Sequence, residues 1–572
     1  MNIRQKHKIS AFLYLLLVLV AGTIYGQRPL DVGEVKVVAP YVPTISDAFK
    51  INDNPRLDNI DLDKPEFLYN IMPRPLPVRF DLEPISAARM RGEPLAKLYQ
   101  GHFRGGFGNY TTPYAEAFYN TLRSNDYSLG VHLKHLSSAG IIKDYGFSGF
   151  SDNLAHVYGK RFIGSNALSG GLRYDRNVIH YYGFRPNDYE GDPVLEPYLE
   201  SITNKDIRQR INQLNTTIGF GSHHPDSTRL GFKTGLEHNW LSDLYGASEH
   251  NLGFNGMIGR EILDPTGLAE QVYLNLNSKA DIFYNVSQAD TSTTGLVTIM
   301  PAVYAKTGRM KLFAGLDMTF QSDTASYFRV YPNIGFEAEL IERYLTVHAG
   351  LSGGLERHSL RNMLKENPFL NTRTAPLAFQ NTKNRITAGI KGAFSDNISF
   401  NLAVASSNID NFALFVTDTA NLLPNQFTTT YDNIRRLHVR GELFSQFGSR
   451  FHARLSTDYF QYSLDQEIEA WHLPTLQVGL NLKYNMQDKI IVSADVFARN
   501  ATFGRAFDTQ NNPVAHKLHD VFVDGNIGIE YRYTRVLSFF VNFYNVQNKS
   551  LERWMNYPSQ KLQVLGGLTW SF

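Results

Sequence analysis

From Leu98 to the C-terminus, apolar and polar residues alternate along the chain with a period of two. In one such run, residues 476–484, apolar side chains take every second position and polar or small residues lie between them. Similar runs recur at 312–320, 345–351 and 521–533. Because successive side chains of a strand point to opposite faces, each run predicts a ribbon with one apolar and one polar face. The repeated pattern predicts an all-β protein.

Short and long connections alternate between the predicted strands. The short ones lie near Arg123, Gly164, Thr307, Ser395, Gln487 and Thr534, and the long ones cover residues 185–206, 357–383, 417–430, 503–514 and 548–558. Short turns at one end and long loops at the other are typical of outer-membrane barrels, whose turns face the periplasm. The sequence therefore predicts a transmembrane antiparallel up-and-down β-barrel of about 22 strands, within a range of about 20 to 24, with both termini periplasmic.

The last predicted strand ends on an aromatic residue. Its apolar positions alternate and lead to Trp570 and the C-terminal Phe572. A terminal aromatic residue in this setting resembles the signal that the barrel assembly machinery recognises during insertion. We therefore expect that machinery and outer-membrane lipid as partners of the chain.

The N-terminus has the composition of a secretory signal peptide. Arg4, Lys6 and Lys8 precede an apolar run at 11–21, and small residues follow up to Gly26. This run is too short for a lasting membrane helix, and no other stretch reaches the roughly 18 apolar residues that a spanning helix needs. We predict three parts, which are a signal peptide (1–26), an extended periplasmic or lumenal segment rich in proline and aspartate (27–97), and the barrel (98–572).

Composition narrows the function classes further. The 572 residues include 31 tyrosines and 38 phenylalanines, which suits the aromatic girdles of a membrane barrel. The absence of cysteine excludes disulfides, thiolate catalysis and cysteine-bound metals. The 56 basic and 54 acidic residues give a net charge of +2, so we expect no nucleic acid partner.

No local motif predicts catalysis, a cofactor or a metal. His223 and His224 are neighbours in a turn, and His132 and His135 would point to opposite faces of one strand, so neither pair makes a zinc site. Nucleophile elbows, phosphate loops and metalloprotease helices are absent from the sequence. We expect no enzyme, no cofactor and no metal. An outer-membrane hydrolase that uses a serine and a histidine at the barrel rim is the least favoured alternative.

Charged residues on the predicted inner faces are candidates for lining a pore. By strand alternation they are Arg173, Asp175, Lys233, Glu237, Lys311, Asp317, His348, Glu356, Lys483, Asp524, Glu530 and Arg532. Mixed charges of this kind also form ion pairs that stabilise the wall of a barrel. The sequence reveals no ring of charges of one sign, which would set ion selectivity.

The start of the predicted barrel resembles a known group of proteins. The runs RGEPLAKLYQGHFRGGFGNYTTPYAE, HLKHLSS, GFSDN and YDRNVIHYYGF are similar to the TonB-dependent-receptor-like barrel proteins of Bacteroidota. The resemblance is best over the N-terminal segment and the first five strands, and it implies a transporter or porin-like channel. It also implies a globular plug inside the barrel. Residues 27–97 are too few for a complete plug, so we expect a barrel that lacks one.

Residues Glu34, Val35, Lys36, Val37 and Val38 resemble the short extended motif by which such receptors engage TonB. Their β-branched run is suited to pairing with a partner strand, although an ordinary extended segment is the simpler interpretation. Two function classes stay open. One is transport of an unknown solute, with the N-terminal segment as a reduced plug. The other is a structural or assembly role, in which the barrel binds periplasmic or surface partners such as a lipoprotein.

Overall fold

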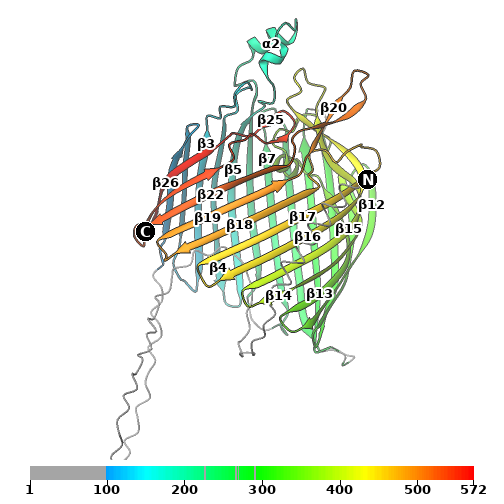
Figure 1. Cartoon of the computed structure of the whole chain (residues 1–572). Coiled ribbons are helices and arrows are strands. Elements are labelled where there is room, and N and C mark those ends of the chain that lie inside the picture. The colour runs from blue at the N-terminus through cyan, green and yellow to red at the C-terminus, as the bar shows by residue number, and fades with distance from the viewer. Residues whose placement is uncertain (1–97, 224–226, 264–266, 268, 289–290) are drawn as a thin grey trace, which may run out of the picture. The chain divides into compact units, whose positions relative to one another are not determined.

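The computed structural model describes residues 98–223, 227–263, 267, 269–288 and 291–572. Their strands form one 22-stranded antiparallel sheet, shown in Figure 1. Each strand of this sheet pairs with the next, and β1 pairs with both β2 and β26, so the sheet closes on itself. The predicted up-and-down barrel is confirmed. The expected signal peptide, the segment 27–97 and the candidate TonB motif at 34–38 lie outside the described residues.

The strands of the barrel have the following bounds: β1 (Gly101–Gly108), β2 (Thr112–Asn120), β3 (Tyr127–Ser138), β4 (Phe150–Ile163), β5 (Asn166–His180), β6 (Arg208–Ser222), β7 (Gly231–Ser242), β8 (Ser248–Ile262), β9 (Gln271–Val286), β10 (Thr291–Thr307), β11 (Met310–Ser322), β12 (Ser326–Ile341), β13 (Leu345–Arg357), β14 (Phe379–Ser395), β15 (Ile398–Thr417), β16 (Phe427–Phe447), β17 (Phe451–Leu464), β18 (Leu476–Met486), β19 (Ile490–Arg499), β22 (Phe522–Arg532), β23 (Leu537–Tyr544) and β26 (Gln563–Ser571). The connections carry two small hairpins and three short helices: β20 (Phe503–Phe507) with β21 (Pro513–Lys517), β24 (Glu552–Trp554) with β25 (Tyr557–Pro558), η1 (Pro186–Tyr189), α2 (Leu195–Ser201) and α3 (Leu360–Glu366).

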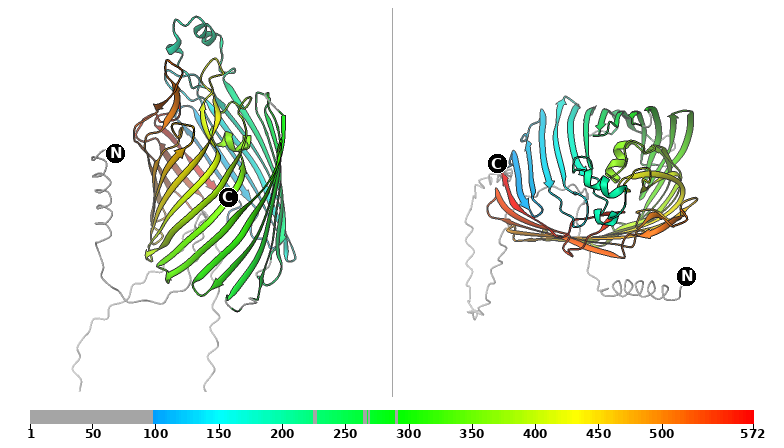
Figure 2. Two further views of the ribbon diagram at one scale, coloured as in Figure 1. Left: turned by 90° about the vertical axis from the view of Figure 1, so that its right-hand side faces the viewer. Right: turned by 90° about the horizontal axis from the view of Figure 1, so that it is seen from above.

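All the predicted long connections lie at one end of the barrel, which we call the loop end. The predicted short connections lie at the opposite end, the turn end, as Figure 2 shows. One boundary differs from the expectation. The connection predicted at 357–383 stops earlier, because β14 begins at Phe379 and Lys383 pairs with Asp410 of the next strand at 2.9 Å. The polar run around Lys383 therefore belongs to the wall and not to a loop.

The outer surface of the barrel carries large apolar side chains. Leu236 and Ile282 are each 53% exposed and Ile386 is 58% exposed. Apolar surface left in water costs roughly 25 cal/mol per Å², so a belt of such residues is stable only against lipid. The described residues contain no helix with the length and apolarity needed to cross a membrane. Leu236, Ile282 and Ile386 all lie on strands, so the strands carry this apolar surface.

The seam between the first and last strands depends on Gly101 and Phe572. The amide of Gly101 donates to the carbonyl of Phe572 at 2.8 Å, and the amide of Phe572 donates to the carbonyl of Gly101 at 2.9 Å. A Cβ on Gly101 would lie 2.2 Å from the Phe572 ring. Glycine at this position therefore lets the terminal aromatic ring cover the seam.

Candidate functional site in the barrel lumen

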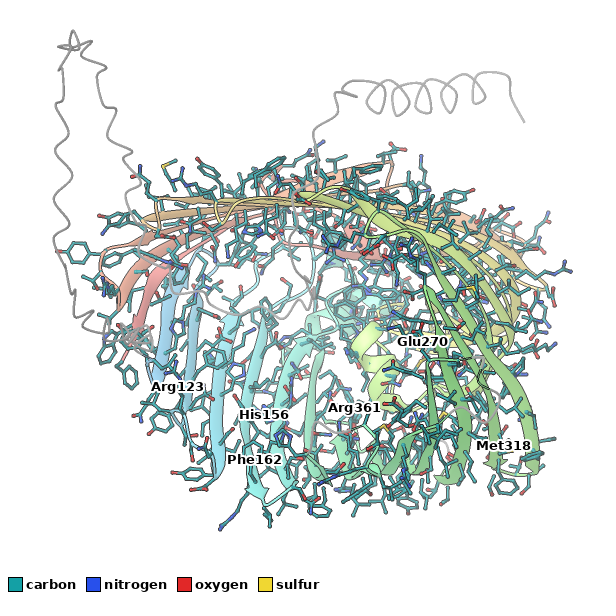
Figure 3. The ribbon with its side chains drawn as sticks, turned by 90° about the horizontal axis from the view of Figure 1, so that it is seen from below. Arg123, His156, Phe162, Glu270, Met318 and Arg361 are labelled. Atoms are coloured by element: carbon teal, nitrogen blue, oxygen red, sulfur yellow. The ribbon has the colours of Figure 1, made fainter. Side chains whose placement is uncertain are left out.

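The connection between β13 and β14, residues 358–378, folds into the barrel, and we call it the lumenal loop. It contains helix α3, which lies inside the ring of strands in Figures 2 and 3. The helix begins after Ser359, whose hydroxyl accepts the amide of Asn362 at 3.2 Å as an N-cap. Leu360, Met363 and Leu364 follow at helical spacing and are each at most 4% exposed. The sequence thus builds a short amphipathic helix that needs an apolar surface to cover it.

The first turn of α3 is fixed to the barrel wall. Glu249 of β8 is 2% exposed and accepts the amides of Leu360 at 2.8 Å and Arg361 at 3.3 Å. The side chain of Arg361 reaches β7, where it donates to Asn239 and lies 3.7 Å from Glu237. A carboxylate at a helix N-terminus satisfies free amides and complements the helix dipole. These contacts fix the start of the helix in place inside the lumen.

The apolar face of α3 packs against side chains from several distant elements. Its partners in one buried cluster include Leu241 of β7, Phe415 of β15 and Tyr557 of β25. Phe369 of the lumenal loop stacks on Tyr557, with ring centroids 3.6 Å apart. The hydroxyl of Tyr181, just after β5, donates to the carbonyl of Leu370 at 3.2 Å. The connections at the loop end therefore form one packed layer, with the lumenal loop as its inner part.

His472, in the connection between β17 and β18, links two parts of this layer. Its Nδ1 lies 3.1 Å from the carbonyl of Phe415, and its Nε2 accepts the amide of Met555 at 3.3 Å. This pattern requires the neutral imidazole, with the proton on Nδ1. Burial lowers the pKa of His472 to about 4. The hydrogen bond from its Nδ1 to the backbone carbonyl of Phe415 acts toward a higher pKa, but its effect is smaller. The layer therefore holds an uncharged histidine at neutral pH.

Toward the turn end, the inner wall carries charged residues that pair with one another. Several of the predicted pore-lining residues are found in these pairs. Arg173 binds Asp175 at 2.7 Å, and Arg532 lies 3.6 Å from Glu530. Lys311 lies 3.6 Å from Glu337, which also contacts Lys391 at 2.9 Å, and Asp317 accepts from Asn333 at 3.4 Å.

The remaining predicted residues have separate surroundings. Glu237 contacts the lumenal loop, and Asp524 is 4% exposed and accepts the amide of Gln547 at 3.2 Å. The Nδ1 atom of His348 is buried and has no hydrogen-bond partner among the described residues. Lys233 of β7 and Lys483 of β18 are exposed in their strands. The predicted residues thus spread around the wall and do not gather at one point.

Glu356 departs from the expected inward position. Its neighbour Arg357 is 5% exposed and lies over Phe283, an inward residue of β9, with 5.2 Å between the guanidinium carbon and the ring centroid. Neighbours along a strand point to opposite faces, so Glu356 points outward. The cause is a register shift between Ser352 and Gly354, after which the inward and outward positions of β13 are exchanged.

The histidine pairs occupy unrelated positions. His132 points inward and contacts Glu116 at 2.9 Å, whereas His135 binds Asn153 at 2.7 Å. No group of three or more potential metal ligands occurs within the described part of the chain.

Sequence reasoning missed the lumenal loop and its anchors Glu249 and Arg361. The cap at Ser359 and the spacing of the three apolar residues after it were the readable signal for α3. No sequence pattern connects Glu249 with Leu360, because 111 residues separate them.

No protein-family model matches the sequence, and no curated protein matches it. Solved structures resemble its fold. The FrpB iron transporter of Neisseria meningitidis superimposes with a TM-score of 0.63 at 10% identity, over 84% of this chain and 82% of that one. The siderophore receptor PirA of Acinetobacter baumannii gives 0.62 at 12% identity, over 84% and 81%.

The ferric-catecholate import receptor Fiu of E. coli K12 gives a TM-score of 0.61 at 11% identity, over 83% of this chain and 82% of that one. At this level of identity the likeness is one of fold. It agrees with the fold implied by the sequence resemblance at the start of the barrel. The chain is therefore a closed 22-stranded barrel with the fold of outer-membrane receptors and transporters.

Proposed function

We propose that this protein transports a solute across the outer membrane and that the lumenal loop restricts its passage. The observation that carries the proposal is helix α3, held inside the barrel by Glu249 and by the buried apolar cluster. A barrel of this size has a lumen that must be filled, narrowed or open. Below the lumenal loop, the wall is polar and ion-paired, as suits a water-filled passage. The loop end then faces outward and the turn end faces the periplasm.

We further propose that segment 27–97 acts from the periplasmic side, as a reduced plug or as a partner-binding strand. The run at Glu34–Val38 supports this role, because extended β-branched segments bind by strand addition. TonB or a periplasmic or surface lipoprotein is the proposed partner, and Phe572 is the proposed signal to the barrel assembly machinery.

Solute flux into liposomes tests transport. The full chain and a chain without residues 28–94 are reconstituted, each with and without the lumenal loop, and the swelling rate in small neutral sugars is recorded. We expect the slowest swelling for the full chain and the fastest for the chain that lacks both segments. Absence of swelling in all four forms would overturn transport.

The connection between β5 and β6 favours a second role in binding a surface partner. It carries α2, which projects beyond the loop end in Figure 1. Its acidic residues outnumber its basic ones, and Val194 and Tyr198 are 59% and 40% exposed. We propose that it binds a basic surface protein. Crosslinking in cells should give a partner that is lost when residues 186–205 are replaced by a short linker, and an unchanged crosslinking pattern would argue against this role.

A further inference from the structure

Three arginines share one face of the wall on the neighbouring strands β5 and β6. Arg210 of β6 pairs in register with Val178 of β5, and Arg208 pairs with His180. Residues two apart along a strand point to the same side, so Arg176, two residues before Val178, lies on this face as well. The Cα atom of Arg210 is about 7–8 Å from those of Arg176 and Arg208. At this spacing, neighbouring guanidiniums can bind the same group.

The face that carries these arginines is the outer one. Ile211, the neighbour of Arg210 on β6, belongs to the buried cluster that packs on α3, and neighbours along a strand point to opposite sides. Leu172 of β5 and Ile218 of β6 share a face with Arg176 and Arg210, and they are 49% and 55% exposed. The arginines therefore continue the apolar outer face toward the loop end.

The arginines begin where the apolar outer face ends. Strand β6 runs from Arg208 at the loop end to Ser222 at the turn end. A tilted strand crosses the hydrocarbon of a membrane in about 9–11 residues, and this length counted from Ser222 ends near Asn212. Tyr174, two residues before Arg176, donates from its hydroxyl to Asn212 at 3.1 Å, as suits an aromatic residue at the membrane interface. With the loop end outward, as proposed above, the arginines lie at the level of the outer-leaflet headgroups.

The described part of the chain supplies no anion to these arginines. None of the three has a carboxylate within 4.0 Å or a side-chain hydrogen bond among the described residues. The Nε atoms of Arg208 and Arg210 are buried and have no hydrogen-bond partner there. The nearby carboxylate of Asp206 accepts the amide and the hydroxyl of Thr203, each at 2.8 Å. Positive charges gathered beside an apolar surface are unfavourable unless an anion balances them.

Another part of the outer wall offers a comparison. Arg435 of β16 pairs with Asn408 of β15, which lies two residues from Ser406, the partner of the exposed Ile386. Arg435 therefore faces outward, and it is as far from the turn end of its strand as Arg210 is. Its register partners on β15 and β17 are uncharged, so it is a single cation at this level.

The neighbouring apolar face indicates which anion fits the three arginines. Guanidiniums bind phosphate through paired hydrogen bonds, and basic residues at a membrane surface attract anionic lipids. A small dissolved anion gains nothing from an apolar surface beside the site. A lipid with a phosphate in its headgroup matches both parts, because its acyl chains cover the apolar face while its phosphate binds the arginines.

We propose that Arg176, Arg208 and Arg210 bind the phosphate group of an acylated lipid of the outer leaflet. Its acyl chains lie along the outer face of β5 and β6, beside Leu172 and Ile218. The site is on the outside of the barrel and goes beyond the proposed transport through the lumen.

Native mass spectrometry of the full chain in detergent tests the site. The probe is lipid A, a phosphorylated and acylated diglucosamine. Its dephosphorylated form is the matched lipid, and pyrophosphate is the dissolved anion. The test variant combines Arg176→Gln, Arg208→Gln and Arg210→Gln.

The matched control combines Arg435→Gln, Arg450→Gln and Arg535→Gln, three exposed arginines away from β5 and β6, so both variants lose the same charge. Resistance of the folded barrel to unfolding in SDS confirms that each variant folds. If the triple test variant does not fold, Arg210→Gln alone is compared with Arg435→Gln alone.

We expect saturable binding of lipid A to the wild-type chain, weakened about tenfold or more in the test variant and less than about twofold in the control. Equal binding of the dephosphorylated lipid, or equal loss in both variants, would overturn the site. Pyrophosphate binding with the same dependence on the arginines, without lipid A binding, would assign them to a dissolved anion and overturn the lipid. This binding does not depend on flux, so a barrel that binds lipid A without transporting a solute contradicts only the transport function.

Discussion

Glu249 accepts the amide of Leu360 at 2.8 Å across 111 residues of chain. This contact joins the wall strand β8 to the first turn of α3 and fixes the lumenal loop inside the barrel. The wall therefore determines where the helix starts, and the apolar cluster determines how it lies. Both kinds of contact must be present for the loop to narrow the lumen.

Removing the Glu249 carboxylate should release the lumenal loop. In Glu249→Ala, the amides of Leu360 and Arg361 lose their acceptor. A hydrogen bond to a charged group contributes about 1.5–3 kcal/mol, so local stability should fall by about 3 kcal/mol. Hydrogen exchange of residues 358–378 should become faster, while exchange in β18 stays unchanged.

The control for this release is Glu356→Ala, because Glu356 points outward from β13, next to the lumenal loop. Its exchange pattern should match that of the wild-type chain. Equal exchange in Glu249→Ala and the wild-type chain would show that the wall contact does not hold the loop.

Acidification should loosen the loop layer through His472. Its pKa is lowered to about 4 in the folded chain, from 6.5 in the unfolded chain. The neutral imidazole therefore contributes fully to the stability of the folded chain above pH 6.5, and this contribution is lost as the pH falls from 6.5 toward 4. A pKa shift of this size corresponds to about 3 kcal/mol in the free energy of unfolding. Protease cleavage in 465–475 should therefore increase over this pH window.

His472→Asn provides a comparison that does not titrate. His472 has a φ of +61°, which asparagine tolerates, and the amide can still donate and accept hydrogen bonds. Cleavage of this variant should depend less on pH than cleavage of the wild-type chain. The same steep pH dependence in both would assign the effect to other groups.

Closure of the barrel should be sensitive to Gly101. Alanine at this position places its Cβ 2.2 Å from the Phe572 ring, so the ring must move from the seam. The cost is about 1–3 kcal/mol, and the yield of SDS-resistant folded barrel should fall. Gly170→Ala is the control, because its Cβ would have Thr217 as its nearest neighbour at 3.7 Å. Equal yields for the two variants would contradict a role for this contact.

The sequence predicted the wall well and the lumen poorly, for a physical reason. Lipid outside and water inside impose a period of two on each strand, so runs such as 476–484 revealed the barrel directly. The predicted inward direction of Glu356 was wrong because a single register shift exchanges the inward and outward positions along the rest of a strand. The position of the lumenal loop inside the barrel was not predicted, because its burial depends on residues distant in sequence, such as Glu249.

Single-channel conductance in planar bilayers tests the central claim, that the lumenal loop restricts the barrel. The comparison uses two chains without residues 28–94, one with the lumenal loop and one in which a short Gly-Ser linker replaces residues 359–377. We predict a larger and steadier conductance for the chain without the loop, and an intermediate, fluctuating one for Glu249→Ala. Equal conductance with and without the loop would contradict the claim.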